Sequence, residues 1–344
     1  MSRQFETGGA PHFPPHATVG GVMRQVLYAL LPGIAAYAWF FGYGVLVQIV
    51  LACVFAQVLE ALMLKVRGKA VGPYLGDYSA IVTAVLFALC IPPLAPWWVA
   101  LVGMIFAIVV AKHLYGGLGN NLFNPAMVGY VVVLISFPQH LTAWPAPAEL
   151  AALGFGPLET LQTIFGGEPP GAASWDAITG ATALDAVRNG TTAGQPIAAI
   201  EQGPAFGILA GHGWEWVALW YAIGGGWLLA RRIISWHVPV AVAGSVLLFS
   251  TAGWLLDPHS HPTPLFDLFS GAVLLGAFFI ATDPVSGCAS PRGRLIFGAG
   301  VGILTLVIRR WGGYPDGIAF AVLLMNLAAP LIDRFTRPRI FGHD

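Results

Sequence analysis

The chain has 344 residues, a length typical of two soluble domains, but its composition excludes a soluble protein. It is 57% hydrophobic and only 9% charged, whereas roughly a quarter of the residues of a soluble domain are charged. The formal net charge is zero, so no basic surface is expected that could hold nucleic acid. The composition therefore predicts an all-α polytopic membrane protein whose surface contacts the lipid bilayer.

Ten apolar segments are candidates for membrane-spanning helices, since one span needs about 20 apolar residues. Several segments are short. Breaks such as Pro92-Pro93 and Asp283-Pro284 persist at membrane depth only where the backbone lines a cavity or is buried in protein. The predicted spans are 24–44, 45–64, 78–93, 97–113 and 124–138, followed by 214–230, 237–256, 265–282, 294–309 and 317–334.

The basic residues orient these segments in the membrane. With segment 1–23 in the cytoplasm, thirteen basic residues fall on the cytoplasmic side and three on the outer side. Because cytoplasmic loops carry the excess of Lys and Arg, both 1–23 and the tail 335–344 are predicted to be cytoplasmic. Loop 139–213 then lies on the outer, periplasmic face. It is too long to be a mere connector, so we expect it to carry a function.

The two halves of the chain, 24–138 and 214–334, resemble each other weakly. Asp77 opens the third span and Asp267 opens the eighth, 190 positions later. Each half contains an odd number of spans, so the second half would enter the membrane from the opposite side. This pattern predicts two inverted five-helix repeats, with a site between them near the membrane midplane. Chance resemblance between apolar helices is the alternative.

Arg309 and Arg310 at the end of the ninth span would be the outer-face counterparts of Lys112. Two guanidinium groups at a membrane boundary can bind an anion, such as a flavin phosphate or a lipid head group. Long basic side chains also extend to the interface without binding a ligand, and this alternative stays open.

Polar residues at the ends of spans are candidates for the path of a translocated cation. Such groups are costly at membrane depth and are therefore functional candidates. Half-helix ends and unwound carbonyls can coordinate a small cation. Capping of a helix N-terminus is the alternative for the two acids that open apolar runs. The candidates are Asp77, Asn120, Asn121, Asn124, Asp267 and Asp283.

The cysteines do not form a metal-binding pattern. Cys53, Cys90 and Cys288 lie far apart, and the sequence contains no CxxC motif. It also lacks a Rossmann-type nucleotide fingerprint. No metal site is therefore predicted on this chain, and iron–sulfur and NAD chemistry would reside on partner subunits.

The outer loop contains a turn of small residues that begins at Asp176 and continues through Thr179, Gly180 and Ala181 to Thr182. Gly180 and Ala181 leave the Thr182 hydroxyl sterically open, and a slim turn of this kind can enter the narrow cleft of a modifying enzyme. Judged from the residue types alone, an ordinary loop is the alternative.

Asp-x-x-Thr-Gly-Ala-Thr resembles the signature at which a flavin transferase joins FMN, through its phosphate, to the final threonine of bacterial respiratory flavoproteins. Two further segments, GGLGNNLFNPA (116–126) and ATDPVSG (281–287), follow at membrane boundaries. With these motifs in this order, the whole chain is similar to one family of membrane subunits. That family includes the D subunit of the Rnf electron-transport complex and the B subunit of the sodium-pumping NADH:quinone oxidoreductase. Ala183 stands where the family pattern has proline, a departure that leaves the acceptor hydroxyl in place.

The resemblance implies covalent FMN on Thr182, with Asp176, Thr179, Gly180 and Ala181 completing the attachment motif. It implies an electron-relay subunit of a ferredoxin:NAD oxidoreductase in the bacterial inner membrane, coupled to Na⁺ or H⁺ translocation. The implied partners are a second covalent-flavin subunit, iron–sulfur and NAD-binding subunits, and a flavin transferase for maturation. A non-covalent riboflavin is also compatible with the family.

Two other functions remain open from the sequence. The first is the quinone-reductase B subunit, which normally has a longer cytoplasmic extension than the short segment before Arg24. The second is a solute channel or transporter built on the same inverted repeat without a redox role. The threonine motif in the outer loop favours a redox function over this second alternative.

Overall fold

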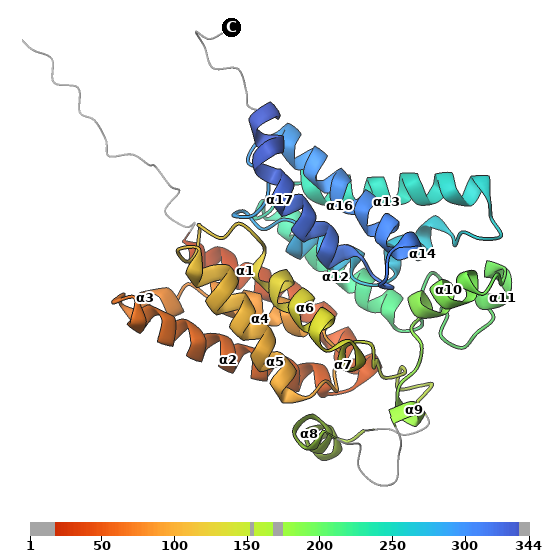
Figure 1. Cartoon of the computed structure of the whole chain (residues 1–344), viewed down its shortest axis with the longest axis horizontal. Helices are drawn as coiled ribbons and strands as arrows, with labels where there is room; N and C mark the ends of the chain where they lie inside the picture. The colour runs from red at the N-terminus through yellow and green to blue at the C-terminus, as the bar shows by residue number, and fades with distance from the viewer. Residues whose placement is uncertain (1–17, 152–154, 168–174, 337–344) are drawn as a thin grey trace, which may run out of the picture.

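The computed structural model describes residues 18–151, 155–167 and 175–336, and it is built from helices (Figure 1). Six of the helices in these ranges are long and apolar enough to cross a membrane. The chain is therefore a multi-pass membrane protein. These helices are α1 (Val19–Phe41), α2 (Gly44–Val66), α5 with its continuation η1 (Trp97–Leu114), α13 (His237–Leu256), α16 (Pro291–Trp311) and α17 (Ile318–Thr336).

The remaining helices of the bundle are shorter, and two of the ten predicted spans are not continuous helices. Span 78–93 contains the ten-residue helix α4 (Ser79–Ala88) and then a non-helical segment. Span 265–282 is divided among α14 (Pro264–Phe269), α15 (Val273–Leu275) and the π-helix η2 (Gly276–Ile280). The other short helices are α3 (Val71–Leu75), α6 (Pro125–Ser136), α7 (Pro138–Leu141) and α12 (Trp214–Ala230).

The segment that follows α4 shows how a helix break is stabilised inside the bundle. Residues 89–96, which include Pro92-Pro93, are buried but not helical. Their carbonyl groups therefore need partners from elsewhere in the protein. The buried Gln48 of α2 donates its side-chain amide to the carbonyls of Pro93 and Ala95.

The corresponding break after α14 is stabilised by ionised side chains. Gly271 adopts a positive φ of 60°, and a Cβ at this position would overlap with the side chains of Asp316 and Arg309. Arg309 donates to the carbonyls of Asp267 and Ser270, both at 2.7 Å. The backbone N–H of Ala272 donates to Asp316 Oδ2 at 2.7 Å. A single glycine thus allows both side chains to approach the broken backbone closely.

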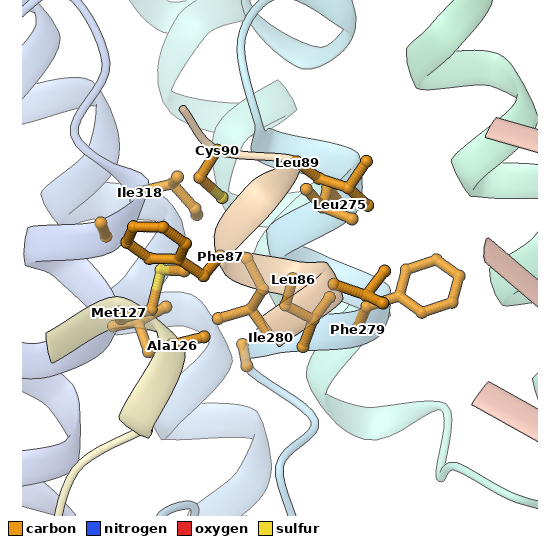
Figure 2. Packing of buried hydrophobic residues seen from close by; sticks show 14 of the residues in the cluster. Leu86, Phe87, Leu89, Cys90, Ala126, Met127, Leu275, Phe279, Ile280 and Ile318 are labelled. Atoms are coloured by element: carbon orange, nitrogen blue, oxygen red, sulfur yellow. The ribbon is translucent and has the colours of Figure 1, made fainter. Parts of the chain in front are cut away.

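The two halves of the chain pack against each other through α1 and α12 and through the broken helices. A Cβ on Gly224 of α12 would overlap with the carbonyl of Ala29 of α1, so the two backbones lie in direct contact. Close approach at small residues is typical of helix packing in membranes. Figure 2 shows apolar side chains of α4, α6, η2 and α17 converging in one cluster; among them are Phe87, Met127 and Ile318.

The described part of the loop between α7 and α12 contains four short helices and is tied to both halves. These helices are α8 (Pro157–Gly166), α9 (Trp175–Ile178), α10 (Ala183–Thr192) and α11 (Ile197–Ile200). Pro145 and Thr179 form a β-bridge. This bridge closes the excursion, as we call segment 146–178, which contains α8. Arg188 of α10 donates to the carbonyl of Gly312 in the second half, so α10 is held over the bundle.

Replacing Gln48 with Leu is expected to lower the free energy of unfolding by about 1–3 kcal/mol, because the carbonyls of Pro93 and Ala95 would lose a buried donor. Thermal or denaturant unfolding of the purified protein in detergent measures this effect. Gln57→Leu on the same helix is the control, since Oε1 of Gln57 has no hydrogen-bond partner within the described ranges. Equal stability of the two variants would contradict the assigned role of Gln48.

Candidate functional site

Thr182 is the N-cap residue of α10. Its hydroxyl accepts a hydrogen bond from the backbone N–H of Asp185 at 3.2 Å and donates to Asp185 Oδ2 at 2.6 Å. The carboxylate of Asp185 also accepts from the backbone N–H of Thr182, which completes a capping box. The local sequence therefore begins a helix at Thr182 and holds its hydroxyl in one orientation.

The other residues of the threonine motif form the turn that precedes α10. Gly180 and Ala181 are exposed, and the backbone N–H of Gly180 donates to the carbonyl of Trp144 at 3.0 Å. The hydroxyl of Thr179 donates to the carbonyl of Trp175, so it is used within the turn. Asp176 lies in α9, and its side chain falls outside the described part of the structure. Of the two threonines, only Thr182 lines the cavity described next.

A cavity lies between the two halves of the bundle, with Thr182 and Asp185 in its wall. We call it the outer cavity because residues of loop 139–213 line it. It has about 1140 Å³ of space not filled by protein atoms, part of which is open to solvent. Cofactor sites are typically mostly apolar and aromatic clefts with a few polar groups. Six aromatic residues stand among the mainly aliphatic lining: Tyr37, Tyr130, Trp144, Trp214, Tyr221 and Tyr314.

Three buried hydroxyl groups in the lining of the outer cavity have no hydrogen-bond partner within the described residues. They belong to Tyr37, Tyr221 and Ser270. Leaving a buried polar group without a partner costs roughly 1–3 kcal/mol, so most such groups in proteins are paired. The outer cavity therefore combines aromatic residues with buried hydroxyls that are available to a polar ligand.

Arg309 and Arg310 do not line the outer cavity; they bind acidic residues of the chain itself. Arg309 is buried and contacts Asp316 Oδ1 at 3.2 Å, in addition to the two carbonyls already described. Arg310 donates to Asp267 Oδ2 at 3.0 Å, and the hydroxyl of Ser250 donates to the same oxygen. The structure thus directs both guanidinium groups to internal acids and does not leave them free for the expected anion.

Asp267 is a buried ion-pair partner rather than a helix cap. Helix α14 is capped by Thr263, whose hydroxyl accepts from the backbone N–H of Phe266 at 3.3 Å. Asp77 does serve the start of a helix: its carboxylate accepts from the backbone N–H of Ser79 at 2.7 Å and from the Ser79 hydroxyl. The two acids predicted to be equivalent therefore have different local roles.

A second cavity, which we call the inner cavity, brings together three of the predicted cation-path residues. It has about 890 Å³ of space, part of it open, and Asn121, Asn124 and Asp283 are in its lining. Asn124 caps α6 and donates to the carbonyl of Ile280 at 3.3 Å. Asp283 accepts from the backbone N–H of Val285 at 3.1 Å. These residues stabilise turns as well as line the cavity.

The remaining candidate, Asn120, is exposed and does not line the inner cavity. It lies in the glycine-rich connection before α6, one residue before Asn121. The structure therefore separates Asn120 from its neighbours Asn121 and Asn124, with which the sequence analysis grouped it.

A buried charge cluster beside the inner cavity was not predicted from the sequence. Lys112 donates to both oxygens of Glu60, at 2.8 and 2.7 Å, and to the hydroxyl of Ser79 at 2.8 Å. His113 Nε2 lies 3.4 Å from Glu60 Oε1, and Arg67 lies 3.2 Å from His113 Nδ1. The signal was available, because Glu60 is a single acid inside the apolar segment 45–64.

Glu215 at the start of α12 is a second residue that the sequence analysis missed. Its buried carboxylate accepts three backbone N–H groups, from Ile208 at 3.2 Å, Leu209 at 2.6 Å and Ala210 at 3.0 Å. Next to Ala210, Gly211 lies against Ala183 of α10. Glu215 thus holds the turn that supports the first residue after Thr182.

Comparison with known proteins places the chain in a family. Residues 6–342 match the family described as NQR2, RnfD, RnfE. The chain belongs to this family. A similar relative is the D subunit of the ion-translocating oxidoreductase complex of Escherichia fergusonii, at 49% identity over 98% of this chain and 99% of the relative. The D subunits of the same complex from Escherichia coli O127:H6 and Shigella dysenteriae serotype 1 are 49% and 48% identical over the same shares.

Membership of the NQR2, RnfD, RnfE family confirms the resemblance found in the sequence. The match extends across both halves of the bundle and the loop that carries Thr182. The relatives are also covered over almost their whole length, so the similarity is not confined to one segment.

Replacing Glu60 with Gln is expected to destabilise the protein by about 3–5 kcal/mol, because buried Lys112 would lose its counter-charge. Thermal unfolding in detergent checks this expectation. The double variant Glu60→Leu with Lys112→Leu removes both charges and should recover much of the loss. If Glu60→Gln and the double variant were equally unstable, the Glu60–Lys112 pair would not be the relevant interaction.

Proposed function

We propose that this chain is the D-type membrane subunit of an Rnf-type ferredoxin:NAD oxidoreductase and that it carries FMN on Thr182. One observation supports this proposal most directly: Thr182, whose hydroxyl is held in place by Asp185, lines a cavity that also contains aromatic residues and unpartnered buried hydroxyls. The names of the relatives, which describe one subunit of an ion-translocating oxidoreductase complex, support the same role. They favour a redox function over a solute channel or transporter.

The residues around the outer cavity fit a covalently attached flavin. Thr182 would hold the phosphate end at the cavity wall, where Asp185 orients the acceptor oxygen before attachment. Aromatic rings such as Tyr37 and Tyr221 offer surfaces for a flat ring system, and their hydroxyls offer hydrogen bonds to its polar edge. When bound, FMN would supply one- and two-electron chemistry, while the protein tunes its potential through such hydrogen bonds and nearby charge.

We further propose that the protein lies in the bacterial inner membrane with both termini in the cytoplasm and loop 139–213 in the periplasm. The distribution of basic residues supports this orientation. Two inverted repeats are supported by matching contacts, since α2 packs against α4 and α5, and α13 packs against α14 and α16. The proposed partners are the iron–sulfur, NAD-binding and second covalent-flavin subunits, with a flavin transferase acting during maturation.

The inner cavity is the second element of the proposed mechanism. A non-covalent flavin such as riboflavin is the proposed occupant, and Lys112 and Asp283 supply ionisable groups at its wall. Asn121 and Asn124 provide amide oxygens of the type that coordinate small cations. Coupling of electron transfer to Na⁺ or H⁺ movement would then involve this side of the bundle.

Replacing Thr182 with Ala is expected to abolish covalent flavin, because the acceptor hydroxyl is removed. In-gel flavin fluorescence of the denatured protein, after co-expression with the flavin transferase, measures the attachment. Thr191→Ala in the same helix is the matched control and should keep its fluorescence, since that hydroxyl bonds only within α10. A fluorescent Thr182→Ala band would show that another residue carries the flavin.

Replacing Tyr221 with Phe is expected to shift the reduction potential of the bound flavin without reducing its attachment, because it removes one hydroxyl from the lining of the outer cavity. A spectroscopic redox titration of the complex measures the potential. Tyr28→Phe, at an exposed position of α1, is the control. An unchanged potential in both variants would argue against a flavin ring beside Tyr221.

A further inference from the structure

Helix α8 in the outer loop has three chemically distinct faces. With 3.6 residues per turn, Leu158, Leu161 and Phe165 lie on one stripe. These side chains are 68%, 40% and 53% exposed. Beside this stripe lie two exposed polar residues, Glu159 and Gln162. Exposed leucine and phenylalanine on a regular stripe indicate a surface that contacts something other than water.

The third face of α8 packs against the bundle. Thr160, Thr163 and Ile164 are buried on this face. The hydroxyls of both threonines donate to carbonyls one turn earlier, those of Gly156 and Glu159, so they need no partner outside the helix. Because the bundle side of α8 is already packed, the exposed apolar stripe is not a part of the protein core.

The position of α8 places its apolar stripe next to the lipid-facing surface of the bundle. Helix α8 contacts α2, and Thr160 lines a groove together with Trp39 and Tyr43 at the turn between α1 and α2. Trp39 is 79% and Tyr43 is 52% exposed. Aromatic residues at the ends of spans are typical of the membrane–water interface.

Helix α2 itself marks where the bilayer lies. It is long and apolar enough to span a membrane, and it exposes one residue per turn along a single stripe. That stripe consists of Leu46, Val50, Val54, Val58 and Leu62. Figure 1 views α8 nearly along its axis while α2 lies across the view, so α8 runs across the end of α2. A helix in this orientation lies along the membrane surface.

We propose that α8 is an interfacial helix that inserts Leu158, Leu161 and Phe165 among the acyl chains of the leaflet nearest to loop 139–213. A helix at the membrane surface beside the bundle needs one face for the protein, one for lipid and one for water, and α8 has all three. Helix α8 contacts α2, a candidate membrane span that also exposes an apolar stripe, and this neighbour identifies lipid as the partner of the α8 stripe. The role does not depend on the flavin, because it follows from α8, α2 and the aromatic residues between them.

The lipid contact would anchor the excursion that precedes the flavin-attachment turn. This excursion begins after Pro145 and returns at Thr179, where the two segments form a β-bridge. Thr182 follows three residues later. Helix α8 would therefore hold the part of the loop before Thr182 at the bilayer. Helix α10 holds the part after Thr182 on the bundle, through the hydrogen bond from Arg188 to Gly312.

The test places a bimane fluorophore on single cysteines of the assembled complex in lipid vesicles, after Cys53, Cys90 and Cys288 have been replaced by Ala. Leu161→Cys and Gln162→Cys are adjacent in sequence but lie on the lipid and water faces. Brominated phosphatidylcholine should quench the label at 161 several-fold more than the label at 162, and aqueous iodide should show the reverse order. Val54→Cys in α2 and Asn189→Cys in α10 provide the lipid and water references.

Either of two outcomes would overturn the proposal. Similar responses of positions 161 and 162 to both quenchers would show that α8 lies away from the bilayer. Protection of position 161 from both quenchers in the complex, with lipid quenching only in the isolated protein, would show that another component of the complex covers this face. Phe165→Cys is the second reporter, so the result does not depend on one substitution.

Discussion

The structure depends on one constraint: backbone groups freed by a helix break inside a membrane protein must find partners within the protein. The fold contains several such breaks, and polar side chains from elsewhere in the chain bind the backbone at three of them. Gln48 donates to a backbone carbonyl of the segment after α4. In the segment after α14, Arg309 donates to a backbone carbonyl and Asp316 accepts from a backbone N–H. Asn326 of α17 accepts from the backbone N–H of Asn124 and donates to the carbonyl of Ser286, which joins two connections from different halves.

This constraint explains why polar residues at membrane depth need not form an ion path. Asn124 lines the inner cavity and Arg309 contacts Ser270 in the lining of the outer cavity, and both complete hydrogen bonds of the backbone. The two roles are compatible, because broken helices create cavities and the same polar side chains then line them or contact their lining. The inner and outer cavities are thus consequences of the breaks rather than separate features added to a regular bundle.

Much of the fold was predictable from the sequence, because apolar segments of spanning length leave few alternatives in a chain with so little charge. Span 265–282 was not predictable as three short pieces, since the break depends on Gly271 fitting against Arg309 and Asp316.

The threonine motif predicted the exposed turn before Thr182. The hydroxyls of Tyr37, Tyr221 and Ser270 could not be assigned to one cavity from sequence, because they come from α1, α12 and the break after α14. Glu60 had a sequence signal, but its partner Lys112 lies 52 positions away.

The apolar cluster in Figure 2 separates the two cavities. Leu89, Leu275 and Ile318 line the outer cavity, whereas Leu86 and Phe279 of the same cluster line the inner one. An ion that entered this cluster would lose its hydration shell without gaining a ligand, at a large cost in free energy. An electron does not require such a shell. The cluster therefore forms a barrier to ions between the outer and inner cavities. An ion can pass from one cavity to the other only around these side chains or after they have moved apart.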